Sequence, residues 1–407
     1  MPGRERCAAQ WTLTVSAAGE AEVDQARGSD DVLPGPDPAA GSSRSRRLRL
    51  AALVVLLAVI AVAVVRVIVA TGPPTRDELR ERAGLTKRDK LLIGVKDDQP
   101  GVSQKLTNGT FEGFDIEIAY MVAEDLGFDA PEVTLLAIQS EDRARRQARN
   151  TDGSYVTVDL VVASYSITEE RKADGVVFSF PYLETEQSVV TLKSDRRAVS
   201  SLRDLADRKV CTLATSTSEQ SLEKATSSEP SLSDVGATVV GKNRISDCIQ
   251  DLYDGKVAAV TTDAAILAGF VGPRPPGELP PAVALNNRKE LAHWDIGDET
   301  PEKWGINTGT NPAVRDLVNL SLQESFAGPD GDRWKRAFDR YLGAEQRYSE
   351  QQQVAVSRQP EPDPEELVEV RQWPWERWAL PTPNRPATGV RTAVPAHARR
   401  SRRNSGC

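Results

Sequence analysis

A run of about twenty apolar residues near the start of the chain limits how the protein can fold more than any other feature. Residues 50–70 read LAALVVLLAVIAVAVVRVIVA, and only Arg66 interrupts them. As a helix this run would rise roughly 30 Å, the thickness of the hydrocarbon core of a bilayer. Arg66 lies about one turn from the end, so its side chain can reach the membrane interface. We therefore expect residues 50–70 to form a single transmembrane helix.

Arginines in front of this run predict which way the helix points. The segment SSRSRRLRL ends at Leu50, and its arginines should be retained in the cytoplasm by the positive-inside rule. The chain from about residue 72 onward is then expected outside the cytoplasm, held at the cell membrane by an uncleaved signal anchor. A cleaved secretory signal is the alternative, but its apolar region is normally about 7–15 residues long. The leader here is also long, at more than 40 residues.

Both ends of the chain are poor in periodic apolar residues. Residues 1–49 combine Gly, Ala, Ser and Pro with scattered charges, and residues 350–407 contain RQPEPDP, PTPNRPATG and RRSRRNSGC. Such segments bury too little apolar surface to offset the entropy of ordering. We expect a disordered cytoplasmic leader and a disordered tail rich in Pro and Arg. The tryptophans of WPWERW in the tail could dock on the folded domain, the membrane interface or a partner, and docking on the chain's own surface is favoured.

Composition excludes several classes of function. The chain has 51 basic and 59 acidic side chains, a net charge of −8 that gives no indication of nucleic-acid binding. Its two histidines and four cysteines lie far apart in the sequence, and none has the spacing of metal ligands. We expect neither a metal site nor a cofactor. Neither His293 nor His397 lies in a recognisable nucleophile motif, so catalysis is not expected either.

Between the two ends, apolar runs alternate with helical patterns, which is typical of α/β domains. KLLIGV, EVTLLAI and DLVVAS read as strands, FDIEIAYMVAEDLG reads as a helix, and a second set of the same kind begins near residue 200. We expect one lobe from residues 88–193 plus 303–347 and a second from 194–302. Two hinge crossings, near SVVTLK and KWGINTG, would join them. Ligands of open α/β sheets bind outside strand carboxyl ends, which predicts a site in the cleft between the lobes.

Four blocks of sequence carry a resemblance to a known family. The segment GFDIEIAYMVAEDL at 113–126 resembles the signature of the bacterial extracellular solute-binding proteins, family 3, the receptors of polar amino-acid ABC transporters. SYSITEERK at 164–172, KVCTLATSTS at 209–218 and GKVAAVTTDAAILAGF at 255–270 follow in the family's order. GVKDDQPG and KWGIN are most similar to the glutamate-binding branch. The resemblance implies a two-lobed, periplasmic-binding-protein-like type II fold.

An amino-acid ligand needs a cation for its carboxylate, and SYSITEERK supplies one. The planar guanidinium of Arg171 can grip a carboxylate with two parallel hydrogen bonds. Ser164 and Ser166 are two residues apart, so in an extended segment both would offer donors to the same end of the ligand. The alternative for Arg171 is a solvated arginine in a charged run, which the resemblance makes less favoured.

The remaining candidate contacts come from other blocks. Asp263 follows a strand and begins a helix; the resemblance implies that it receives the ligand ammonium, and the alternative is a helix N-cap. The resemblance also implies that Thr217 and Ser218 contact the ligand from the second lobe, where a Ser/Thr-rich turn at a helix start can bind an anion. Capping by these hydroxyls can hold at the same time. Lys96 is a candidate partner for a side-chain carboxylate, although a lysine at a strand end is usually solvated.

Two of the cysteines, Cys211 and Cys248, fall in the second lobe. Members of the glutamate-like branch carry cysteines at these places, and the resemblance implies a disulfide, which the space outside the cell permits. Two buried free thiols are the alternative.

Together these features predict a non-catalytic receptor outside the cytoplasm. It would bind glutamate or a related polar amino acid between its lobes and deliver it to an ABC import permease by closing. The alternative is a membrane-anchored sensor whose outer domain signals amino-acid binding to a cytoplasmic regulator.

Overall fold

The apolar run near the start of the chain forms one continuous helix, α1 (Ser42–Thr71). Its Ser45–Thr71 part is long and apolar enough to cross a membrane, by length and composition. A signal sequence near the N-terminus can meet the same criteria. The computed structural model describes residues 42–150, 152–227, 238–272, 285–296, 301–327, 332–346, 349 and 354–371. Residues from Thr71 onward form a second compact unit.

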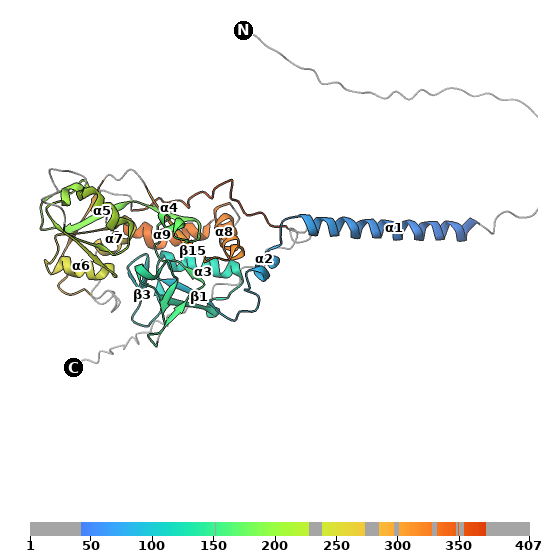
Figure 1. The fold of residues 1–407 in the computed structure, drawn as a ribbon, viewed down its shortest axis with the longest axis horizontal. Coiled ribbons are helices and arrows are strands. Elements are labelled where there is room, and N and C mark those ends of the chain that lie inside the picture. Colours follow the sequence, from blue (N-terminus) through green and yellow to red (C-terminus); the bar gives the residue numbers. More distant parts are fainter. Residues whose placement is uncertain are drawn as a thin grey trace, which may run out of the picture. The chain divides into compact units, whose positions relative to one another are not determined.

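The first lobe of this second unit is built on a mixed five-stranded sheet (Figure 1). Its strand order is β5 (Val133–Ala137), β1 (Leu91–Val95), β8 (Leu160–Val161), β15 (Glu302–Asn307) and β9 (Phe178–Thr185). β1 pairs parallel with β5 and β8, whereas β15 runs antiparallel between β8 and β9. The parallel strands bring the ends of β1 and β8 to the same edge, and this edge carries lobe 1's part of the site.

The second lobe repeats this plan with strands in the order β12 (Thr238–Lys242), β11 (Lys209–Leu213), β13 (Ala259–Asp263), β10 (Gln187–Leu192) and β14 (Leu291–Asp295). β11 is parallel to β12 and β13, and β10 is antiparallel to β13 and β14. β10 therefore belongs to lobe 2, whereas the sequence analysis placed 188–193 in lobe 1. The first crossing instead lies between β9 and β10.

Helices cover both sheets. Lobe 1 carries α2 (Arg76–Arg82), α3 (Phe114–Leu126), α4 (Glu169–Ala173), α8 (Pro312–Ala327) and α9 (Asp332–Glu345), and lobe 2 carries α5 (Thr217–Ser227), α6 (Ile245–Tyr253) and α7 (Ala264–Val271). The helices α5, α6 and α7 gather at one end of the unit, away from α2 and α8 (Figure 1). Short 3-10 turns occur at η1 (Ala130–Glu132), η2 (Ser140–Asp142) and η3 (Leu202–Leu205).

The helix α3 shows how the sequence determines these elements. Gly113 precedes it with φ 131°, and an added Cβ there would lie 2.3 Å from the carbonyl oxygen of Val102, so only glycine fits. Gly127 ends the helix in the left-handed conformation, as expected of a C-cap. Phe114 is fully buried and meets the ring of Trp334 of α9 edge to face.

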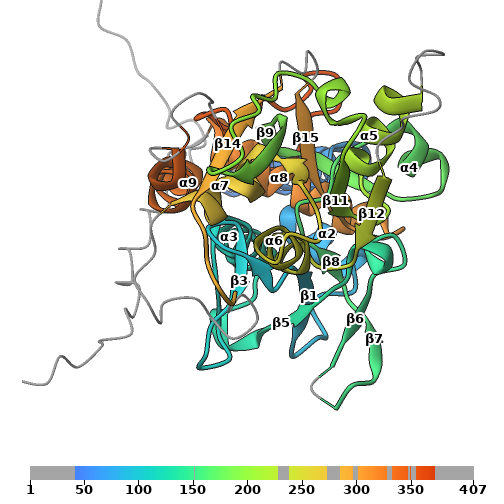
Figure 2. The same cartoon turned by 90° about the vertical axis from the view of Figure 1, so that its left-hand side faces the viewer.

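Two small antiparallel sheets lie beside the main sheet of lobe 1. One consists of β2 (Asp98–Gln99), β3 (Ser103–Lys105) and β4 (Phe111–Glu112), and the other of β6 (Gln147–Arg149) and β7 (Tyr155–Thr157). The β6–β7 hairpin projects away from the rest of the lobe (Figure 2). β2 contacts lobe 2, because Asp98 accepts hydrogen bonds from Ser246 at the start of α6.

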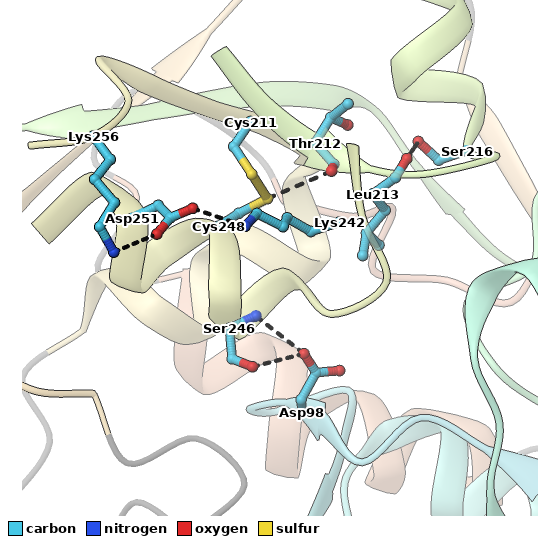
Figure 3. The surroundings of a disulfide bond; sticks show 10 residues. All are labelled: Asp98, Cys211, Thr212, Leu213, Ser216, Lys242, Ser246, Cys248, Asp251 and Lys256. Atoms are coloured by element: carbon cyan, nitrogen blue, oxygen red, sulfur yellow. Dashed lines mark hydrogen bonds and ion pairs between the residues drawn. A yellow bond between two sulfur atoms is a disulfide. The ribbon is translucent and has the colours of Figure 1, made fainter. Parts of the chain in front are cut away.

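A disulfide joins Cys211 on β11 to Cys248 on α6, with 5.4 Å between their Cα atoms (Figure 3). The structure therefore contradicts the alternative of two buried free thiols. Both residues are fully buried, so the bridge fixes α6 on the sheet from within the core of lobe 2.

Residues 354–371, here called the C-terminal strap, lie on the folded unit, whereas the sequence predicted a disordered tail from residue 350. Val356 donates its backbone N–H to the carbonyl of Glu184, and Ala355 bridges Thr185 at the end of β9. Val354 is buried against α7 of lobe 2. At the other end, the backbone N–H of Arg371 donates to the carbonyl of Pro74. The tryptophans of WPWERW, like most of the leader, lie outside the described residues.

Candidate functional site

The two lobes contact each other along the loop that follows β1. Arg244 of lobe 2 donates to both carboxylate oxygens of Asp97 at 2.9 Å. The next residue, Asp98, accepts hydrogen bonds from the backbone N–H and the hydroxyl of Ser246, both at 3.0 Å (Figure 3). Ser246 lies in the first turn of α6, where the helix dipole favours a carboxylate. Lobe 1 thus caps a helix of lobe 2, and the two lobes are in direct contact here.

Arg171 lies at this boundary, on the short helix α4. Its guanidinium donates to the carbonyl of Ser166 at 2.6 Å and, across the boundary, to the carbonyl of Thr215 at 3.1 Å. The same guanidinium stacks 4.7 Å from the ring centre of Tyr165. A second arginine, Arg143, stacks on that ring at 4.5 Å. The buried ring of Tyr165 therefore holds two cations beside the site.

Arg143 and Lys96 are buried cations inside lobe 1. Arg143 donates to backbone carbonyls, including that of Ser164 at 2.9 Å, and Lys96 donates to the hydroxyl of Ser140 at 3.1 Å. Burial lowers the pKa of Lys96 to about 8 and that of Arg143 to about 10. Among the described residues, neither cation forms a hydrogen bond or ion pair with a carboxylate. The carboxylates of Asp97 and Asp98 act on Lys96, and that of Asp263 acts on Arg143, only through electrostatics without a direct contact. A bound anion here would add a direct counterion.

Asp263 occupies the N-cap position of α7, but its side chain makes no capping hydrogen bond. Its carboxylate instead accepts a hydrogen bond from the indole N–H of Trp304 at 2.5 Å. Burial raises the pKa of Asp263 well above its usual range, and the neighbouring Glu302 carboxylate raises it further. The N-cap alternative therefore has no hydrogen bond to support it. A cation arriving beside Asp263 would favour its ionised form.

The donors of Ser164 are already used within lobe 1. Ser164 has φ 45°, and in this left-handed conformation its backbone N–H donates to Asp115 at 2.8 Å. Its hydroxyl donates to the side-chain oxygen of Gln99 at 3.0 Å. Ser164 and Ser166 are both buried at the site, but Ser164 has no donor left for a ligand.

Ser166 of lobe 1 and Thr217 of lobe 2 meet on one carboxylate. Both hydroxyls donate to Glu302, the first residue of strand β15 in the lobe 1 sheet, and the Thr217 hydroxyl lies 2.8 Å from each of its oxygens. Glu302 thus joins the two lobes through side chains on each of them.

Several buried polar atoms near the lobe boundary have no hydrogen-bond partner among the described residues. Four come from residues discussed above or from the first crossing: Asp98 Oδ1, Gln99 Nε2, Gln187 Oε1 and Ser218 Oγ. Buried polar groups are nearly always paired. Unpaired atoms from both lobes at one boundary are what a site for a polar ligand would show.

Contacts link three of the seven residues that the sequence predicted for the site: Arg171 donates to the carbonyl of Ser166, and the hydroxyls of Ser166 and Thr217 share one carboxylate. Lys96 pairs with Ser140 instead, and the role of all seven as ligand contacts stays a prediction. Arg143, Glu302 and Trp304 were not among the predicted site residues. Arg143 lies in RARRQAR, which reads as a solvated charged run. The only available signal was its place after the strand EVTLLAI, where the site side of a sheet is expected.

Comparisons with known proteins agree with this architecture. The family model of the bacterial extracellular solute-binding proteins, family 3, matches residues 91–344. The chain is 30% identical over 258 residues to the glutamate-binding protein GluB of Corynebacterium efficiens, which covers 62% of this chain and 77% of that protein. It is 33% identical over 191 residues to the ABC transporter glutamine-binding protein GlnH of Bacillus subtilis, covering 46% and 63%.

Among solved structures, an ancestral arginine-binding protein bound to arginine has a TM-score of 0.50 and 27% sequence identity. The match covers 63% of this chain and 99% of that one. The predicted two-lobed type II fold is confirmed. One distant relative is an enzyme by name: the membrane-bound lytic murein transglycosylase F of Pseudomonas putida is 22% identical, and the match spans 47% of it.

Proposed function

Because this chain belongs to the bacterial extracellular solute-binding proteins, family 3, we propose that it is a non-catalytic receptor for an acidic or closely related polar amino acid. The ligand would bind between the lobes, with Arg171 at its α-carboxylate and Asp263 at its ammonium. Lobe closure around the ligand would produce the contacts between Asp97 and Arg244 and between Asp98 and Ser246.

One observation carries this proposal: the site holds charges of both signs that form no direct ion pair among the described residues. Arg171 contacts only carbonyl oxygens and an aromatic ring, and Asp263 accepts only an indole N–H at hydrogen-bond distance. A zwitterion supplies one charge for each of them. Such charge-assisted hydrogen bonds are about twice as strong as neutral ones.

Lys96 and Arg143 favour glutamate over neutral amino acids. Both are buried cations that form no direct ion pair with a carboxylate among the described residues, and a second carboxylate on the ligand would supply one. The name of the Corynebacterium relative points in the same direction. Glutamine, the ligand named for the Bacillus relative, would leave more positive charge uncompensated.

The helix α1 supports an anchored receptor on the outer face of the cell membrane that delivers its ligand to an ABC permease. The same helix also permits the sensor alternative, in which the folded unit signals across the membrane to a cytoplasmic regulator. Uptake of radiolabelled glutamate by cells with and without the gene separates the two. A transport subunit requires uptake to fall when the gene is deleted, whereas a sensor leaves uptake intact and alters a regulated response.

Calorimetric titration of the detergent-solubilised full chain with glutamate, aspartate, glutamine, asparagine and arginine tests the receptor function. We expect glutamate to bind with micromolar or tighter affinity, about −8 kcal/mol. Arg171→Ala should abolish this binding because the ligand carboxylate would lose its partner. Lys172→Ala is the matched control, since its exposed side chain pairs with Glu169 away from the site. Absence of heat with all five ligands would refute the proposal.

A further inference from the structure

Glu302 was not predicted to be part of the site, yet it is the point where side chains of both lobes meet. We infer that Glu302 is a positioning residue. It accepts the hydrogen bonds of the Ser166 and Thr217 hydroxyls, which leaves their lone pairs directed toward the ligand and so selects for an amino group. This inference rests on the proposed function and deepens it, because it assigns a chemical preference to one end of the site.

The first step is to count hydrogens. A serine or threonine hydroxyl has one proton to donate and two lone pairs that can accept. An ionised carboxylate can only accept. Ser166 and Thr217 both lie at hydrogen-bond distance from the Glu302 oxygens, so each hydroxyl donates its one hydrogen bond to Glu302. What remains at both hydroxyls is acceptor capacity alone.

The second step concerns which part of a ligand can use these acceptors. A ligand carboxylate needs donors, which Ser166 and Thr217 can no longer supply through their hydroxyls. A ligand ammonium has three N–H donors and no acceptor. The sequence analysis assigned the donors of Ser166 to the ligand carboxylate, and this hydrogen-bond pattern assigns its hydroxyl oxygen to the ammonium instead.

The third step is the charge around these hydroxyls. The Glu302 carboxylate is close enough to Asp263 to raise the pKa of that carboxyl group. The two carboxylates therefore act on each other electrostatically. Glu302 also holds the hydroxyls of Ser166 and Thr217, so negative charge and hydroxyl oxygens gather at this part of the lobe boundary. Trp304, two residues after Glu302, holds Asp263 by its indole N–H. The same short strand thus orients both groups that would receive the ammonium.

The experiment compares amino acids with their des-amino analogues. The wild-type full chain is titrated with three pairs: glutamate and glutarate, glutamine and glutaramate, and arginine and 5-guanidinopentanoate. The pair whose amino acid binds most tightly is then used for all variants. In Glu302→Gln the amide can donate, so the hydroxyl protons are no longer fixed. We expect the preference for the amino acid over its analogue to shrink at least tenfold. Glu184→Gln is the matched control, since Glu184 lies on the adjacent strand β9 and pairs with Lys303.

Ser166→Ala and Thr217→Val give an independent readout if Glu302→Gln does not fold. Each removes one acceptor, and each should weaken the amino acid at least tenfold while leaving the des-amino analogue nearly unchanged. Equal weakening of both members of the pair would show that the hydroxyls serve the carboxylate, and this would overturn the inference. Wild-type protein that binds none of the amino acids would instead refute the receptor function itself.

Discussion

Asp115 shows how single residues behind the site support it. Its carboxylate is fully buried and accepts hydrogen bonds from the Ser164 backbone N–H and from the Tyr182 hydroxyl, at 2.8 and 3.1 Å. Burial raises the pKa of Asp115 to about 7, and these two donors only partly oppose that rise. Because Ser164 adopts a left-handed conformation, Asp115 also holds a backbone geometry that a serine would not favour alone.

Asp115 makes stability depend on pH in a defined window. The folded protein binds the carboxyl proton more tightly than the unfolded chain. The contribution of Asp115 to the free energy of unfolding is therefore fully present below about pH 4 and is lost as the pH rises through about 7. The slope is at most about 1.4 kcal/mol per pH unit. In Asp115→Asn this contribution disappears, because the amide is neutral and the Tyr182 hydroxyl can accept its N–H.

Urea unfolding of both proteins at pH 4 to 8 measures this difference. Between about pH 4 and 7 the free energy of unfolding of the wild type should fall relative to that of Asp115→Asn. Above that window the two free energies should change in parallel. Curves that stay parallel throughout would show that Asp115 is ionised in the folded protein across the whole range.

At the residue scale, sequence reasoning works where function lies in a contiguous block. Arg171 and Asp263 each follow a strand inside a recognisable motif, so the sequence could single them out, and their role at a ligand stays a prediction. Glu302 could not be predicted because its partners, Ser166 and Thr217, lie 136 and 85 residues away in the sequence. The direction of a hydroxyl proton depends on such distant partners, and nothing in SYSITEERK records it.

At the scale of elements, the helix α7 controls how closely the lobes approach. Gly269 on α7 faces the loop after β1, and an added Cβ would lie 1.9 Å from the carbonyl oxygen of Pro100. That contact crosses the lobe boundary. The absence of a side chain at Gly269 therefore allows the two lobes to approach this closely.

Gly269→Ala should weaken ligand binding at least tenfold while leaving each lobe folded, because the methyl group blocks closure and alanine suits a helix better than glycine. Gly343→Ala in α9 is the control. Its added Cβ would meet ordinary contacts at 3.5 Å or more, so we expect unchanged affinity and slightly higher stability. Titration calorimetry and thermal unfolding of both variants check this, and full affinity in Gly269→Ala would contradict it.

The disulfide between Cys211 and Cys248 also acts at the scale of elements, because it joins β11 to α6. It closes a loop with a sequence separation of 37 residues, and in the chain-entropy model such a bridge contributes about 4 kcal/mol. Cys211→Ala with Cys248→Ala should lower the denaturation midpoint accordingly. Reduction with dithiothreitol should lower the midpoint of the wild type to the same extent and leave that of the double variant unchanged. A wild-type midpoint that is the same with and without dithiothreitol would contradict the prediction.

The assignment of β10 shows where element prediction fails. SVVTLK was correctly recognised as strand-like, but its lobe was wrong. A strand's own residues report that it is extended, whereas its neighbours decide its sheet. β10 pairs with β13 and β14, which lie 70 or more residues later in the chain, and no local pattern contains that information.

At the scale of the whole molecule, the C-terminal strap adds a third connection between the lobes. Val354 is fully buried with Ala264 and Ala268 of α7, while the following residues pair with β9 of lobe 1. Farther along, Gln359 donates to the carbonyl of Leu322 on α8 at 2.6 Å. Composition alone could not predict this order, because the strap is held by hydrogen bonds to distant segments and not by a core of its own.

Val354→Ala should destabilise the folded unit by about 1–2 kcal/mol, because it removes two methyl groups from a buried contact. Hydrogen exchange should then increase at the end of β9 and at the start of α7, on both sides of the lobe boundary. Val370→Ala, at a partly buried position of the same strap, serves as the control. Exchange that increases only in one lobe would contradict a role in joining the two.

The end of the strap has a mechanical consequence. Arg371 is fastened to Pro74 by its backbone N–H and to Glu78 by its guanidinium, each at 2.9 Å, and Pro74 lies only three residues after the end of α1. Both ends of the folded unit therefore leave it at one point. A force applied between α1 and the residues after Arg371 would therefore pull on these contacts of Arg371 before it reached either sheet, and the two sheets would be shielded from it.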